Sequence, residues 1–146
     1  MAITQAIANS FKKLLLEGDQ NFKASGGDKF KIALYTSSAT LNSATTSFTT
    51  GNQVPNSGQY TAGGGALVNG TVSMTAGVAR ADFADRSFTG VTITARGALI
   101  YNTSSTTTNA AVCVLDFGAD KTATSGVFTI QFPANTSTSA ILRISG

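Results

Sequence analysis

A pair of carboxylates, Asp82 and Asp85, is the strongest candidate for chemistry in this chain. Two acids held at a suitable separation can act as general acid and general base in glycoside cleavage. Such a site also needs aromatic platforms for the sugar, and the chain has no Trp and only 3 Tyr. The residue types therefore favour a structural role, in which the two acids pair with Arg80 and Arg86 or accept hydrogen bonds from backbone amides at a turn.

The other reactive residue types lead to the same conclusion. Asp116 and Asp120 could bind calcium at a turn, but their spacing matches no calcium-binding loop. The run Gly63-Gly64-Gly65 is not followed by the Lys-Ser/Thr of a phosphate-binding loop, which favours a flexible loop. Cys113 is the single cysteine and lies in an apolar run, as a buried and inert thiol would.

Histidine is absent from the chain. Its absence removes Ser-His-Asp and Cys-His catalysis, zinc sites built on imidazole, and the commonest general base. We therefore predict a protein that is not an enzyme, with no catalytic residue, no cofactor and no metal site.

Composition bounds the possible partners. Charged residues make up 12% of the 146 residues, about half the usual share, while Thr and Ser number 22 and 15. The net charge is +3, and the basic residues form no run of three, so we predict no nucleic-acid binding. No apolar stretch approaches the length of a membrane span, so we predict no membrane partner. The chain needs no disulfide, which suits synthesis in a reducing cytosol.

One helix is expected, over residues 4–17. Thr4 can cap it, and apolar residues recur at helical spacing at Ile7, Phe11 and Leu15. Gly18 can take the left-handed conformation that ends a helix. A helix of this length is marginal alone, so it must dock on its own sheet or on a neighbouring subunit.

Residues 28–146 read as strands of a single all-β domain that spans residues 1–146. Residues 29–35 alternate, with Phe30, Ile32 and Leu34 on one face and lysines on the other. Residues 36–65 form a long loop, in which residues 44–50 could hold a short helix or strand and Tyr60 could be an anchor. Polar turns are expected at residues 102–109 and 120–126. The remaining strands are predicted at residues 66–75, 78–83, 88–101, 110–117, 127–132 and 140–144. About 6–8 short strands at these spacings predict an antiparallel β-sandwich with one N-terminal helix.

Six segments resemble, together and in order, a family of small structural proteins of tailed bacteriophages. They follow a start that contains Ala-Ile-Thr-Gln and cover nearly the whole chain: Phe30–Thr36, Tyr60–Gly65, Asp82–Asp85, Thr94–Asn102, Val112–Gly118 and Phe128–Pro133. The resemblance implies a virion component, with a capsid cement (decoration) protein as the first expectation. A tail, baseplate or head-fibre role stays open, and the family supplies no catalytic residue to transfer.

The resemblance also implies partners and a location. These are the major capsid protein or other virion proteins, a homo-oligomeric state, and a place in the virion after assembly in the host cytoplasm. A cement protein must bind across capsid-protein junctions, through a docking helix and exposed loops. The residues expected to make such contacts are Phe11, Lys12, Leu15, Phe48 and Tyr60. A carbohydrate-binding module is the third alternative, and it would use Asp82 and Asp85.

Overall fold

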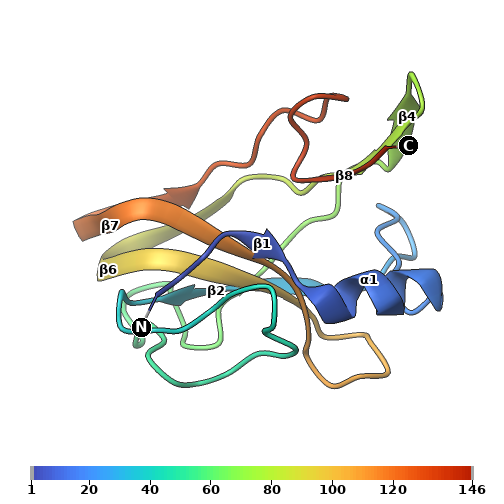
Figure 1. The fold of residues 1–146 in the computed structure, drawn as a ribbon. Helices are drawn as coiled ribbons and strands as arrows, with labels where there is room; N and C mark the ends of the chain where they lie inside the picture. The colour runs from blue at the N-terminus through green and yellow to red at the C-terminus, as the bar shows by residue number, and fades with distance from the viewer. Residues whose placement is uncertain (1, 146) are drawn as a thin grey trace.

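The computed structural model describes residues 2–145 and shows an all-β protein with one short helix (Figure 1). The described residues form two antiparallel sheets, which confirms the predicted fold class. The larger sheet has the strand order β1-β7-β6-β2-β3, and the smaller has the order β4-β5-β8. The elements are β1 (Ala6–Ile7), α1 (Asn9–Leu16), β2 (Phe30–Tyr35), β3 (Gly65–Ala66), β4 (Ser73–Thr75), β5 (Val78–Ala81), β6 (Arg86–Asn102), β7 (Ala110–Ile130) and β8 (Leu142–Ile144).

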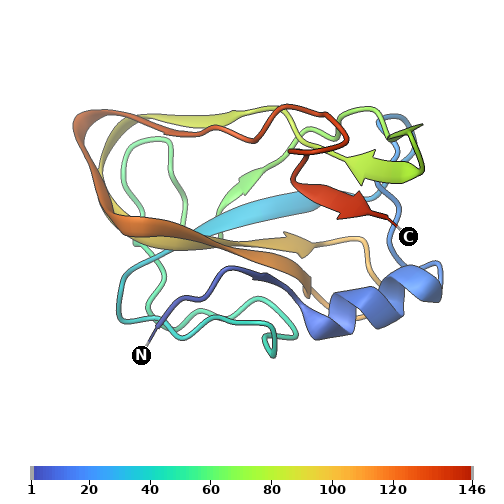
Figure 2. The same ribbon diagram turned by 45° about the horizontal axis from the view of Figure 1, so that its top comes forward.

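A long, bent hairpin of β6 and β7 forms the frame of the molecule. Its strands pair from Asn102↔Ala110 at the turn to Arg86↔Ile130 at the open end, with four irregularities in register. Bulges of this kind bend a strand and increase its twist, and Figure 2 shows the hairpin curving over from one sheet toward the other. The predicted turn at residues 120–126 is therefore wrong, because Lys121, Thr122 and Ala123 pair with β6 inside a continuous strand.

The N-terminal helix is shorter than predicted. Residues 4–17 were expected to be helical, but the helix spans Asn9–Leu16, and Ala6 and Ile7 form a strand that pairs with Val114 and Cys113 of β7. Thr4 is not the cap, because the N-cap position is occupied by Ala8, and the Thr4 backbone N–H bonds the carbonyl of Leu41. Pairing with β7 satisfies the backbone groups of Ala6 and Ile7. This tertiary pairing outweighs the local preference of these residues for a helix, so the helix begins after them.

Strand β2 confirms the alternating pattern in part. Phe30, Ile32 and Leu34 are buried and Lys31 is exposed, but Tyr35 is buried as well. The Tyr35 hydroxyl bonds the Thr49 carbonyl, so the loop that follows β2 lies against this face of the strand at its C-terminal end. The strand predicted over residues 66–75 is wrong in extent, because only its two ends are extended pairs, in β3 and β4.

The loop over residues 36–65 is present and is tied to the core at defined points. The buried Tyr60 hydroxyl accepts a hydrogen bond from the Leu34 backbone N–H at 2.8 Å, which confirms its role as an anchor. The Tyr35 hydroxyl donates to the Thr49 carbonyl at 2.6 Å. Residues 44–50 hold no helix or strand, only the single bridge Ser47↔Ala110.

Aromatic rings join the helix and the two sheets. Phe22 stacks on Phe30 with ring centroids 4.6 Å apart, and Phe11 meets Phe22 edge-on at 5.8 Å. Phe83 contacts Phe30 on one side and Phe132 on the other. This chain of contacts runs from α1 through β2 to the segments that flank the smaller sheet, so the described chain has one continuous core.

Candidate functional site

Only one acid of the predicted pair makes a structural contact. The Asp85 carboxylate accepts the backbone N–H of Phe132 at 2.8 Å, as the structural interpretation predicted. Asp82 forms no ion pair, and one of its carboxylate oxygens is buried without a hydrogen-bond partner among the described residues. The structure thus ties one acid to a loop and gives the pair no common partner.

The two arginines expected to neutralise these acids bind elsewhere. Arg80 donates to the Asn135 carbonyl at 3.2 Å and to the Thr75 hydroxyl at 3.0 Å. The guanidinium carbon of Arg86 lies 4.5 Å from the centroid of the Phe88 ring. The predicted ion pairs of Asp82 and Asp85 with Arg80 and Arg86 are therefore wrong, and the cation–π contact replaces one of them.

In the second acid pair, Asp116 and Asp120, the first acid is engaged by its neighbours. Asp116 accepts hydrogen bonds from the Gly118 backbone N–H at 2.9 Å and from the Arg96 guanidinium at 3.2 Å. The Gly118 bond first, and then the Arg96 contact, lower the pKa of the Asp116 carboxyl. Between residues 2 and 145 no three His, Cys, Asp or Glu side chains gather as a metal site would require.

The cysteine and the glycine triplet also have structural explanations. Cys113 is buried, and burial raises the pKa of its thiol to about 12, so it stays protonated and a poor nucleophile. A side chain at Gly64 would meet the Ile32 carbonyl, and one at Gly65 would meet the Arg86 guanidinium. Gly64 also has φ +97°, so both its conformation and its packing require glycine.

The five residues predicted to make contacts with partners lie in different environments. Phe11 and Tyr60 are buried in the core, Leu15 and Phe48 are half-buried against it, and Lys12 is exposed. The Phe48 ring stacks on Tyr101 at 4.8 Å. Phe11 and Leu15 line the same depression beside α1, whereas Phe48 and Tyr60 are not among the residues that line it.

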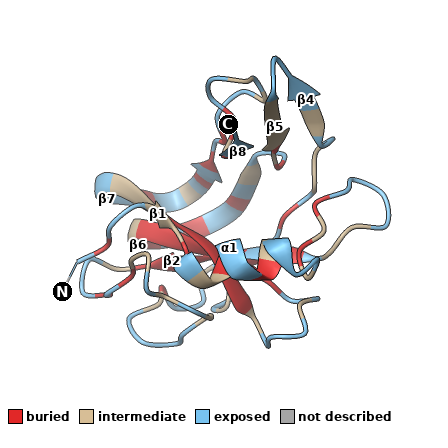
Figure 3. Cartoon of the chain, turned by 45° about the vertical axis from the view of Figure 1, so that its right-hand side comes forward, coloured by how far each residue is buried: buried red, intermediate tan, exposed pale blue. Residues whose placement is uncertain are grey.

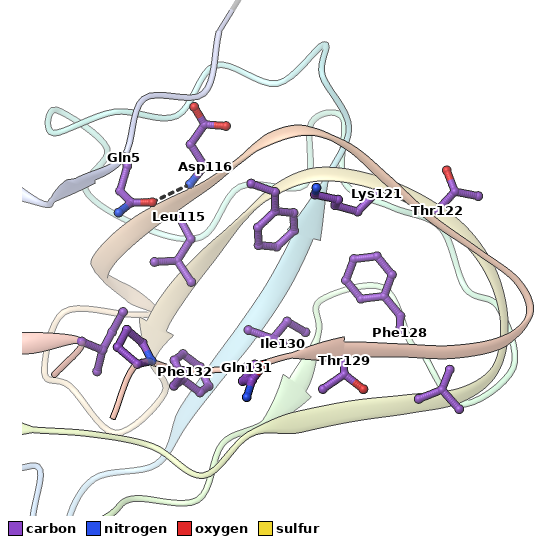
Figure 4. A pocket seen from close by; sticks show the side chains of 14 residues that line it. Gln5, Leu115, Asp116, Lys121, Thr122, Phe128, Thr129, Ile130, Gln131 and Phe132 are labelled. Carbon is purple, nitrogen blue, oxygen red and sulfur yellow. Dashed lines mark hydrogen bonds between the residues drawn. The ribbon is translucent and has the colours of Figure 1, made fainter. Parts of the chain in front are cut away.

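A pocket of about 480 Å³ lies inside the bend of β7 (Figure 4). Both arms of the strand line it, with Leu115 and Phe117 from one arm and Phe128 from the other. Gln5, from the segment before β1, accepts the Asp116 backbone N–H at 3.1 Å at its edge. The pocket therefore combines these apolar side chains with polar ones, among them Lys121 and Gln131.

A second depression, of about 520 Å³, separates α1 from the smaller sheet; we call it the β8 groove. Ile7, Phe11 and Leu15 form one wall, and Leu142 and Ile144 of β8 belong to the other. Figure 3 shows the small sheet standing clear of the helix at this end of the molecule. The residues that line the groove include no acid and three basic residues, Lys23, Arg80 and Arg143.

Large apolar side chains stay exposed beside this groove. Met74 is 71% exposed and Ile144 is 59% exposed, and Val72 is also exposed. Met74 and Ile144 both lie opposite Ala79, so the three form one row across the sheet, on the face that carries Leu142. A contiguous apolar surface rimmed by polar residues is a mark of an interaction site.

Sequence reasoning identified the helix side of the groove and missed the sheet side. Leu142 and Ile144 lay in a predicted strand, but nothing in one short strand indicated that Ile144 would stay exposed while Leu142 is buried. The sequence feature that could have indicated this apolar surface is the pair Val72 and Met74, two apolar residues set among Ser, Thr and Gly. An apolar residue that no neighbouring element can cover is visible only when the elements are assembled.

No helix within residues 2–145 has the length and apolar character needed to cross a membrane. Comparison with protein-family models, with curated proteins and with solved structures found no match to the chain.

Proposed function

We propose that this protein is a structural component of a bacteriophage virion, and that it acts as a capsid cement protein on the lattice of the major capsid protein. The observation that carries the proposal is the exposed apolar row of Met74, Ala79 and Ile144 beside the β8 groove. The ordered resemblance of six segments to small phage structural proteins supports the same conclusion. The partner is the capsid protein, and the protein works without a catalytic step.

The energetics suit a stable attachment. Complete burial of a Val, Leu, Ile or Met side chain contributes roughly 1.5–3 kcal/mol. Ile144, Met74 and Leu16 are each more than half exposed in the free chain, so each has most of that free energy still to gain at an interface. These exposed apolar residues stand on a framework that the core of the described chain already stabilises.

The bent hairpin supplies the rigidity that such a role needs. Strands β2, β6 and β7 bury large side chains completely, among them Ile32, Leu34, Leu99 and Ile100. The groove is set at one end of this frame, so a contact there is made without reorganising the core. Little ordering entropy is then lost on binding, which favours attachment at many lattice positions.

Mass spectrometry of purified particles of the encoding phage tests the proposal. The protein is expected in a fixed ratio to the major capsid protein, and its density is expected on the outer shell in a map of the intact particle. Density on the tail, baseplate or a head fibre would replace the cement role by one of those. Complete absence from purified particles contradicts the proposal.

A further inference from the structure

The smaller sheet has a free edge beside the groove. Its order is β4-β5-β8, so β8 pairs with β5 on one side, and no backbone hydrogen bond reaches its other side within the described chain. An unpaired edge exposes a row of N–H and C=O groups that an extended segment can pair with.

The same two segments of the chain contribute residues to both hollows. Ile141 lines the pocket inside the bend of β7, and the next three residues, Leu142–Ile144, line the β8 groove. On the opposite side, Gln5 lines the first hollow and Ile7 the second. The segments that contain Gln5 and Ile7 on one side and Ile141–Ile144 on the other therefore line both hollows, and we call the space that they border beside β8 the trough.

The side chains of β8 alternate in a way that specifies an incoming strand. Leu142 and Ile144 lie opposite Ala81 and Ala79, on the face that borders the trough. Arg143 lies opposite Arg80, on the other face of the small sheet, and both arginines also border the groove. Two like charges directly opposite each other are unfavourable. No carboxylate within residues 2–145 pairs with either, and the guanidinium of Arg143 donates to the Ser137 carbonyl at 3.2 Å.

We propose that an extended segment of another virion protein adds to the free edge of β8 and fills the trough. Its alternate residues are apolar and pack against Phe11, Leu15 and Ile144, and the residue beside Arg143 is acidic. The charge of the surroundings selects this occupant, because the basic residues of the groove have no acidic neighbour in its lining. This inference rests on the proposed virion role and identifies the partner chemistry of that surface.

A second copy of the same chain fits this edge poorly. The antiparallel register that pairs all three residues of β8 with a symmetric β8 is centred on Arg143 and places that residue against itself. Each copy also carries a net charge of +3. Both facts favour a distinct, acidic partner segment over self-pairing.

Selection from a displayed library of random twelve-residue peptides tests the inference with the purified chain. Enriched peptides are expected to alternate apolar residues with at least one Asp or Glu. Methylating the backbone nitrogens that face β8 is expected to abolish binding, and methylating the alternate set is not, because only one set bonds an added strand.

Variants link the binding to this edge. Ile144→Glu is expected to weaken the best peptide at least about tenfold, since its carboxylate would have to be desolvated in the trough. Val68→Glu is the matched control, because Val68 is 67% exposed and lines neither hollow. Arg143→Glu, at an exposed position, is expected to change the selected acids to Lys or Arg.

Each other outcome overturns the inference. Enrichment of peptides without alternation, no enrichment above an unrelated protein, or equal binding to the Ile144→Glu variant would exclude strand addition at β8. A dimer of the free chain that Ile144→Glu dissociates would assign the edge to self-association. If peptides bind as expected but particles lack the protein, the virion role is wrong, while β8 still binds acidic extended segments. If particles contain it and peptides fail, only the strand inference falls.

Discussion

The two sheets of this protein differ in how far their apolar residues are covered. In the larger sheet, Ile32, Leu34, Leu99 and Ile100 are completely buried. In the smaller sheet, Leu142 is buried, but Met74 and Ile144 remain mostly exposed. The same residue types thus build the frame in one sheet and leave a contact surface on the other. A three-stranded sheet whose two edge strands have three residues each cannot cover its own inner face, so a partner can complete it.

The largest expected effect comes from truncating a leucine that is buried in the larger sheet, compared with one that is exposed. Leu99→Ala, at a completely buried position of β6, is expected to lower the free energy of unfolding by about 2–5 kcal/mol through lost burial and a cavity. Leu16→Ala, on α1 at 90% exposure, is expected to change it by less than about 0.5 kcal/mol. Urea denaturation of both variants measures the difference, and equal effects would mean that the larger sheet is not the stability centre.

Hydrogen exchange compares the sheets without mutation. Amides of β2, β6 and β7 that bond within the ladder are expected to exchange only on global unfolding. Amides of β4 and β8 are expected to exchange through local opening, faster by about two orders of magnitude or more. Peptide-resolved exchange of the free chain checks this, and uniform protection of both sheets would contradict the view that the smaller one lacks cover. A bound edge segment is expected to slow exchange in β8 first.

The loop anchor gives an intermediate effect. Tyr60→Phe leaves the buried Leu34 N–H without its acceptor and is expected to cost about 1–3 kcal/mol. Tyr101→Phe is the matched control, since it removes a donor from the Gly63 carbonyl at a position where water can approach more readily. Thermal unfolding of both variants is the measurement. A smaller loss for Tyr60→Phe than for Tyr101→Phe would show that the loop is not held through Tyr60.

Local pattern predicted the larger sheet better than the smaller one. Strand β2 could be predicted because Phe30, Ile32 and Leu34 alternate with lysines. The anchor at Tyr60 could be predicted because it is a single large aromatic residue in a polar loop. The continuous strand over residues 120–126 could not be predicted, because Asp120 and Gly126 are residue types that favour turns. The long pairing with β6 and its bulges decide that segment, and pairing between distant residues leaves no local signal.

The candidate site was only half predictable for the same reason. Phe11 and Leu15 are four residues apart, so helical spacing placed them on one face. Their opposite wall, Leu142 and Ile144, comes from the other end of the chain, and its position depends on how β5 and β8 pair. The helix start was misplaced because Ala6 and Ile7 have a partner in β7, which local propensity does not include.

The smallest effect concerns a charge that ties a loop to the larger sheet. The Asp19 carboxylate accepts the Ser105 hydroxyl and the Thr106 backbone N–H, and these bonds, the Ser105 bond first, lower the pKa of Asp19 below its ordinary 3.8. A lowered folded-state pKa contributes stability that is present above the unfolded value and is lost as the pH falls through the folded one. Asp19→Asn is therefore expected to unfold at a lower temperature than the parent at pH 7, and this difference in unfolding temperature is expected to disappear below about pH 3.

Asp120→Asn, at an exposed carboxylate of β7 without a hydrogen bond in the described chain, is the control and is expected to show no such gap. Thermal melts across this pH range decide the matter, and a gap that persists at low pH would assign the loop's attachment to neutral hydrogen bonds instead of charge.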